Sequence, residues 1–281
     1  MSSVKSELIQ LCEVAARKFD LPLVKQVYMP EPRPARDKDS EFGIVVLEDG
    51  SSGLYYAWMG EGQSGMNERY AAQDFEGLNP LELVQFYSST NEADRSLGLA
   101  AINAISQFVF RRADFRLTRP LDSMGELEVV PGDHVGMVGY FPSLVRRLRE
   151  QNVRLTVIER KTKFIQNDAM LKVTLDAKEL LSCNKVLSTA TTLLNDSIDE
   201  MLEYTLSAEL VIIIGPTAGF FPDPLFKRGV SVVGGSEIVD AEMAISKLTN
   251  EQGLGDSAEK YIVKRSDYPG AKGLFEKSGL K

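Results

Sequence analysis

The sequence has few of the side chains that bind soft metals, because its 281 residues include only two Cys and one His. A structural zinc site takes about four Cys or His ligands, so these residue types cannot complete one within a protomer. Cys12 falls in an apolar helical stripe and Cys183 at the end of another predicted helix, which favours core packing for both. His134 precedes a predicted strand, so we expect it at the surface, at the sheet edge away from any ligand.

Long apolar runs and basic clusters are also missing from the sequence. Runs such as residues 210–214 are far shorter than the roughly 20 residues of a membrane helix. Residues 1–5 lack the basic-then-apolar pattern of a signal peptide. The formal net charge is -8 and Lys and Arg are scattered, which disfavours a nucleic-acid partner. We therefore expect a cytoplasmic protein with no membrane or nucleic-acid partner, and a homodimer stays open.

No catalytic triad, metal motif or P-loop occurs in the sequence, and its most informative stretch is residues 133–142. There an apolar strand ends at Gly139 and a helix begins at Pro142, as at the start of a nucleotide-binding half of a doubly wound sheet. Gly136 and Gly139 do not form the G-x-G-x-x-G fingerprint, because Tyr140, Phe141 and Pro142 stand where small residues would approach a pyrophosphate. This departure weakens the case for a dinucleotide.

The amino-terminal half has the pattern of an α+β domain. Apolar residues between Val4 and Phe19 recur at three- and four-residue spacing and predict an amphipathic helix. Strands are predicted at residues 23–29, 42–47 and 53–59, the last two as a hairpin, and a nearly all-apolar helix at residues 97–111 must be buried between layers. The pattern fades between residues 115 and 132, so we predict two domains, residues 1–117 and 118–281.

Strands and helices alternate in the second half, as in α/β proteins. The predicted strands are residues 135–138, 154–158, 185–188, 210–214 and 230–233, and the predicted helices are residues 142–151, 176–181, 196–205, 224–228 and 240–250. Continuous apolar runs suit strands that are buried on both faces of a parallel sheet. We therefore predict a five-stranded parallel sheet, with an insertion-like polar stretch at residues 160–173 and a weakly patterned tail after Gly253.

Four separated blocks, residues 97–104, 138–141, 189–195 and 215–217, resemble the putative heavy-metal chelation family. The resemblance runs in order from about residue 41 to residue 240. It implies a small enolase N-terminal-like α+β domain followed by a Rossmann-like α/β domain, with an active site in the cleft between them. It also connects the chain with the handling of heavy metals or metal chelators.

The turns after successive parallel strands meet at one edge of a sheet, and they supply the ligand-binding candidates. These are Gly139, Tyr140, Phe141, Glu159, Thr189, Thr191, Thr192, Asn195, Gly215, Pro216, Thr217 and Gly234. Glu159 ends the second strand, where a carboxylate can bind a ribose hydroxyl or an amine; its alternative role is a loose surface pair with Arg160 or Lys161. The glycines can equally serve tight turns, and Asn195 or Asp196 can cap the next helix.

The glycine-rich segment 60–69 has the composition of a mobile loop that could cover the cleft. Within it, Glu61, Asn67 and Arg69 are the lid candidates, and an ordinary surface loop is the alternative.

These observations favour a protein that binds a small polar ligand in the interdomain cleft, in heavy-metal or metal-chelator handling. A metal would arrive on oxygen ligands or already held by a small organic chelator. One alternative is a transferase or oxidoreductase that uses an adenosine-type cofactor, S-adenosylmethionine or a nucleotide, at Gly139 and Glu159. Another is a non-catalytic, metal-responsive binding partner.

Overall fold

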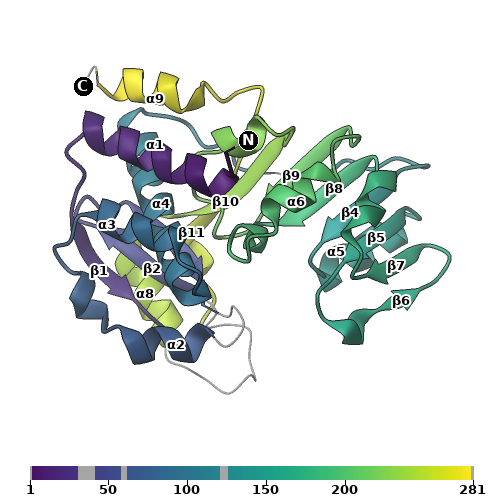
Figure 1. Ribbon diagram of the computed structural model, residues 1–281, viewed down its shortest axis with the longest axis horizontal. Helices are drawn as coiled ribbons and strands as arrows, with labels where there is room; N and C mark the ends of the chain where they lie inside the picture. The colour runs from purple at the N-terminus through teal and green to yellow at the C-terminus, as the bar shows by residue number, and fades with distance from the viewer. Residues whose placement is uncertain (1, 31–41, 58–61, 121–125, 280–281) are drawn as a thin grey trace.

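The computed structural model describes residues 2–30, 42–57, 62–120 and 126–279, and it contains two sheets (Figure 1). The small sheet is antiparallel and has the order β1-β2-β3, with β1 at Val24–Tyr28, β2 at Phe42–Leu47 and β3 at Ser52–Tyr56. The large sheet has eight strands in the order β11-β10-β9-β8-β4-β5-β7-β6. The predicted fold class, a small α+β unit followed by a Rossmann-like α/β unit, is confirmed.

Helices α1 to α4 cover the small sheet and fill the space beside it. They span Val4–Lys18 (α1), Gly62–Arg69 (α2), Pro80–Gln85 (α3) and Glu92–Arg112 (α4). Helix α4 is buried along almost its whole length, as its apolar sequence requires. Gly53 makes this packing possible, because a Cβ at that position of β3 would lie 1.9 Å from the carbonyl oxygen of Ala100.

The large sheet contains the five predicted strands and three more. The predicted ones are β4 (His134–Val138), β5 (Arg154–Ile158), β8 (Lys185–Thr189), β9 (Leu210–Ile214) and β10 (Val232–Ile238); the others are β6 (Gln166–Asn167), β7 (Leu171–Thr174) and β11 (Ala258–Lys264). Strands β6 and β11 lie antiparallel at the two edges, so six strands, not five, form the parallel part.

One parallel strand, β7, was not predicted, and the cause is its alternating pattern of burial. Only Leu171 and Val173 are buried there, and they alternate with half-exposed Lys172 and Thr174, which is typical of a strand near a sheet edge. The polar segment 160–173 is therefore part of the sheet rather than an insertion into it. The weakly patterned tail likewise supplies β11, in which Tyr261, Ile262 and Val263 are buried.

The remaining helices are α5 (Pro142–Glu150), α6 (Ile198–Glu203), α7 (Asp223–Phe226), α8 (Ala241–Thr249) and α9 (Gly270–Ser278). Short 3₁₀ turns are η1 (Ala72–Phe75), η2 (Phe86–Ser88), η3 (Thr162–Phe164), η4 (Ala177–Ser182), η5 (Ala190–Leu193) and η6 (Gly255–Ser257). The helix expected at residues 176–181 is thus the 3₁₀ turn η4. Among the described helices, none has both the length and the apolar composition of a membrane span.

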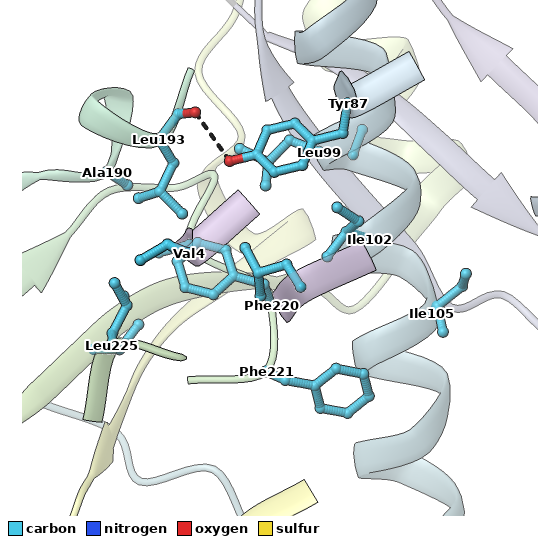
Figure 2. Packing of buried hydrophobic residues seen from close by; sticks show 14 of the residues in the cluster. Val4, Tyr87, Leu99, Ile102, Ile105, Ala190, Leu193, Phe220, Phe221 and Leu225 are labelled. Carbon is cyan, nitrogen blue, oxygen red and sulfur yellow. Dashed lines mark hydrogen bonds between the residues drawn. The ribbon is translucent and has the colours of Figure 1, made fainter. Parts of the chain in front are cut away.

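The largest hydrophobic cluster combines residues from both halves of the chain. Figure 2 shows Leu99 and Ile102 of α4 on the side of Phe220 and Phe221, which follow β9. In the same cluster, the hydroxyl of Tyr87 donates a hydrogen bond to the carbonyl oxygen of Leu193, at 2.9 Å. The segments that follow β8 and β9 are therefore packed against α4, whereas α5, β5, β6 and β7 extend away from the small sheet (Figure 1). The division at residue 117 stays a prediction.

Candidate functional site

The parallel strands β7-β5-β4-β8-β9-β10 have the order 3-2-1-4-5-6 when they are numbered along the chain. This is the order of the dinucleotide-binding Rossmann fold, and ligands of such sheets bind beyond the carboxyl ends of the strands, where the order reverses. The reversal lies between β4 and β8, because the chain continues from β4 to β5 on one side and from β8 to β9 on the other. The candidate site is therefore the edge at which the turns after β4 and β8 meet.

Gly139 forms the turn after β4 and has a φ of 89°, a conformation that L side chains rarely adopt. Its N–H donates to the carbonyl oxygen of Ile158 at 2.9 Å. A Cβ at this position would lie 3.1 Å from Cγ2 of Thr189. Gly139 therefore lets the turns after β4 and β8 approach each other closely.

Glu159 follows β5 and ties two backbone segments together. One carboxylate oxygen accepts the N–H of Tyr140 at 3.1 Å, and the other accepts the N–H of Lys161 at 3.0 Å. Neither Arg160 nor Lys161 forms an ion pair with it among the described residues. The carboxylate is thus fixed at the edge, beside the turn that contains Gly139.

The hydroxyl groups after β8 bond mainly to one another and to their own loop. Oγ1 of Thr189 and Oγ1 of Thr191 are 3.0 Å apart, and the Thr192 hydroxyl donates to the carbonyl oxygen of Thr189 at 2.8 Å. Oδ1 of Asn195 accepts the N–H of Ser197 at 3.1 Å and the Ser197 hydroxyl at 2.6 Å. Thr189 and Thr191 are half-buried, whereas Thr192 is buried. Asn195 therefore stabilises the turn before α6, in the manner of an Asx turn.

The turn after β9 continues the row toward β10. The N–H of Gly215 donates to the carbonyl oxygen of Gly234 at 3.0 Å, and a Cβ on Gly215 would lie 3.0 Å from Cβ of Ala190. Pro216 is exposed, but Thr217 is buried and its carbonyl oxygen accepts a hydrogen bond from Asn103 of α4 at 2.8 Å.

The structure thus separates the predicted residues other than Asn195 into two sets. A half-buried or exposed row follows the sheet edge, and it consists of Glu159, Tyr140, Phe141, Gly139, Thr189, Thr191, Gly215 and Pro216. Gly234, within β10, is buried at the end of this row, and Thr192 and Thr217 are buried on the side of α4. The edge row is the part that a ligand could contact directly.

The predicted lid is a helix rather than a loop. Residues 62–69 form α2, whose Met66 is buried. The packing of this apolar side chain stabilises a helix in spite of the glycines in the segment. Asn67 donates to the carbonyl oxygen of Pro30 at 3.0 Å, and Arg69 pairs with buried Asp94 at 3.1 Å. Both contacts lie within the amino-terminal half. Glu61 lies outside the described residues.

The described residues contain no group of three His, Cys, Asp or Glu side chains that could hold a metal ion. Burial raises the pKa of the Cys12 thiol far above its usual range and that of Cys183 to about 11, so both stay protonated near neutral pH. The two thiols are packing residues, as the sequence suggested.

His134 is held in the fold rather than free at the surface. Because a carbonyl oxygen only accepts, Nδ1 of His134 donates to Ser182 at 3.0 Å, which leaves Nε2 to accept from the hydroxyl of Thr156 at 2.8 Å. Burial and the neighbouring Arg154 lower the pKa of His134. Its position at the start of β4, away from the carboxyl edge, agrees with the prediction, but its partial burial does not.

The sequence interpretation missed two groups of residues around the site. Tyr87 and buried Arg95 hold the loop after β8, since Nε of Arg95 donates to the carbonyl oxygen of Leu194 at 2.8 Å. On the other side, the rings of Tyr140 and Phe164 stack at 5.1 Å with an interplanar angle of 9°. Beside this pair lies an open hollow of about 560 Å³, lined by Tyr140, Pro142, Val145, Arg146, Arg149 and Glu150. The sequence signal that could have identified this aromatic pair is Phe164 itself, an aromatic residue within the polar stretch 160–173.

Comparison with known proteins identifies relatives of the whole arrangement. Two family models, both described as "Putative heavy-metal chelation", match residues 122–266 and 41–106. An uncharacterized protein of Methanocaldococcus jannaschii is 30% identical over 168 residues, which are 58% of this chain and 62% of that protein. The match therefore spans about three fifths of the relative's length.

Two solved structures of proteins of unknown function from the same family share the fold. The protein from Pyrococcus horikoshii has 21% identity and a TM-score of 0.62, over 92% of this chain and 97% of that chain. The protein from Desulfitobacterium hafniense DCB-2 has 18% identity and a TM-score of 0.67, over 92% and 99% of the two chains. Because the first family model covers more than half of the sequence, the chain belongs to the family described as "Putative heavy-metal chelation".

Proposed function

We propose that the protein binds a small polar ligand at the carboxyl edge of β4 and β8, and that this ligand is a metal ion already held by a small organic chelator. The observation that carries the proposal is Gly139, which adopts a left-handed conformation against Thr189 where the strand order reverses. A turn of this kind lets a ligand approach the backbone closely. Glu159, Thr189 and Thr191 supply the polar groups that would orient the ligand.

The proposal of a chelate follows from the family and from the donor set. The family's description concerns heavy-metal chelation, yet the described residues offer no cluster of three metal-binding side chains. The side chains present thus do not fit a tightly bound bare soft metal. A chelator that brings its own ligand atoms removes this conflict, because the protein then recognises the organic part.

An adenosine-type cofactor is the second candidate, favoured by the strand order and by Glu159 at the end of β5. The turn is poorly suited to a diphosphate, however. The N–H groups of Gly139 and Tyr140 already donate to Ile158 and Glu159, and Pro142 has no N–H. A cofactor without phosphates near this turn, such as S-adenosylmethionine, fits better than a dinucleotide.

A thermal-shift panel separates these functions, because a ligand stabilises only the form that it binds. We expect iron(III) dicitrate or a similar chelate to raise the melting temperature, while Zn²⁺ or Ni²⁺ alone does not. At a concentration of 100 Kd a ligand adds about 2.7 kcal/mol to the free energy of unfolding. Stabilisation by S-adenosylmethionine and not by chelates would support the transferase alternative. Binding of a chelate without any turnover would leave the non-catalytic role.

Gly139→Ala tests the location of the site, and Gly77→Ala is its matched control. Both glycines have a positive φ, of 89° and 76°, but a Cβ on Gly77 would meet no atom within 4 Å. Both variants should lose stability, by more than about 1 kcal/mol, whereas only Gly139→Ala should weaken chelate binding by tenfold or more. Equal affinities in the two variants would move the site away from this turn.

A double variant, Cys12→Ala with Cys183→Ala, tests whether the metal is held by a chelator rather than by the two thiols. Removing two buried side chains should lower the free energy of unfolding by about 1 to 3 kcal/mol and leave chelate affinity unchanged. Loss of metal binding in a folded double variant would assign the metal to the thiols instead.

A further inference from the structure

One segment of the chain is rich in basic side chains. Between Pro142 and Thr174 the chain carries eight Lys and Arg against three Asp and Glu, although the whole chain carries 32 against 40. This segment contains α5, β5, β6 and β7, which extend together away from the small sheet (Figure 1). This segment of an acidic protein therefore has a positive formal charge.

The hollow beside α5 is lined mainly by this segment and adjoins the candidate site. Tyr140 lines the hollow, and its N–H donates to Glu159 at the sheet edge. Arg146 and Arg149 line the same hollow and are exposed. Arg149 forms a salt bridge with exposed Asp168 at 3.2 Å, and Arg146 has no ion pair within the described part of the chain. One guanidinium is thus unengaged and the other is held in place.

Tyr140, which lines the hollow with these arginines, belongs to a stacked aromatic pair. The stacked rings of Tyr140 and Phe164 are both half-buried, and the Lys163 ammonium lies 5.1 Å from the centre of the Phe164 ring. Guanidinium groups bind carboxylates and phosphates in a planar, often bidentate geometry. Apolar walls with a few converging charged groups are typical of sites for small molecules.

We propose that the hollow recognises the anionic groups of the ligand, so that the ligand class is a small carboxylate- or phosphate-bearing molecule. Arg146 and Arg149 bind these groups while the Tyr140 and Phe164 pair packs against the organic part. This inference rests on the proposed function, and it makes the bound chelate an anionic one. Glu159 does not line the hollow, and of the three charged residues that do, Arg146 and Arg149 are cationic and Glu150 is anionic.

The experiment uses the full chain and calorimetric titration with probes that differ in charge and in acidic group. The anionic chelate is iron(III) dicitrate and the cationic one is tris(ethylenediamine)nickel(II); free citrate and AMP separate carboxylate from phosphate recognition. The variant is Arg146→Ala with Arg149→Ala. The control is Arg17→Ala, an exposed arginine of α1 on the opposite part of the molecule.

We expect the wild type to bind iron(III) dicitrate and not the cationic chelate. The double variant should lose at least tenfold in affinity with an unchanged melting temperature, and Arg17→Ala should stay within twofold. Comparable binding of the cationic chelate, or an equal loss in Arg17→Ala, would overturn the inference and leave the proposed function standing. If the arginine variant loses affinity and Gly139→Ala does not, the proposed function fails instead. Tighter binding of a single-stranded oligonucleotide than of citrate would replace the small ligand with a nucleic acid.

Discussion

Glu159→Gln should cost both stability and ligand affinity, and the structure gives the size of each. Glutamine keeps the shape of the side chain but has one acceptor oxygen, whereas the two carboxylate oxygens of Glu159 accept the N–H groups of Tyr140 and Lys161. One of these N–H groups therefore loses its partner, and the other bond loses its charge. Hydrogen bonds to charged groups contribute about 1.5 to 3 kcal/mol and neutral ones about 0.5 to 1.5 kcal/mol. Because Glu159 is half-exposed, water replaces part of the loss, and we expect a decrease of about 1 to 2 kcal/mol.

The loss of the hydrogen bond that a hydroxyl or protonated carboxyl group of the ligand donates to the carboxylate is separate and amounts to about 1.5 to 3 kcal/mol, or roughly a factor of ten or more in Kd. Urea denaturation measures the first effect, and calorimetric titration with iron(III) dicitrate measures the second. Glu76→Gln is the control, since Glu76 is exposed and the same charge is removed.

Two results would refute this reasoning. An unfolding free energy equal to that of the wild type would mean that the bonds to Tyr140 and Lys161 contribute nothing in solution. An unchanged Kd in a destabilised Glu159→Gln protein would make Glu159 a positioning residue of the turn that does not contact the ligand.

Two further predictions concern the amino ends of the strands in the large sheet, opposite the candidate site. Lys185→Met should lower the free energy of unfolding by about 3 to 5 kcal/mol, measured by urea denaturation, because it leaves buried Asp133 without the ammonium 2.8 Å away; a cost below about 1 kcal/mol would contradict this. His134→Gln should remove a pH dependence of the free energy of unfolding, because the pKa of His134 is lowered in the folded protein. The contribution of His134 to stability is present above its unfolded pKa of about 6.5 and is lost as the pH falls through its folded pKa. The stability difference between wild type and variant should therefore narrow on acidification, and a difference that widens would refute the assignment of neutral His134.

Much of the large sheet could be predicted because its central strands are buried on both faces. Strands such as β9, Leu210–Ile214, are continuous apolar runs that few other structures accommodate. Strand β7 and the edge strands β6 and β11 were not predicted, because partly exposed strands can contain polar residues and then lack a continuous apolar run. Helix α2 was not predicted for another reason. Four of the ten residues at positions 60–69 are Gly or Ser, and of residues 66–69, whose burial the structure describes, only Met66 is buried.

The convergence of the loops could be predicted from topology alone, but the state of each side chain could not. Gly139 and Thr189 lie close together because the carboxyl ends of neighbouring parallel strands lie at the same edge of the sheet. The partners of Glu159 are backbone groups of a turn whose shape depends on Gly139, and no spacing rule contains that information. Arg95 and Tyr87 hold Leu194 and Leu193 across about a hundred residues of chain, so only the folded protein brings them together.

Helix α4 explains why one side of the site is fixed while the other is open. Its amide side chains bind the loop after β9, since Asn103 donates to Thr217 and Gln107 donates to Gly219. The same amides also donate to Leu54 of β3 and to the Tyr261 hydroxyl of β11. Both side chains are buried, so an apolar replacement would leave the loop carbonyls without donors, at about 1 to 3 kcal/mol each. The turns after β8 and β9 are therefore held by α4, whereas the turn at Gly139 and the hollow beside α5 face solvent. A ligand that contacts both turns would meet preorganised backbone on one side and the arginine and aromatic side chains beside α5 on the other.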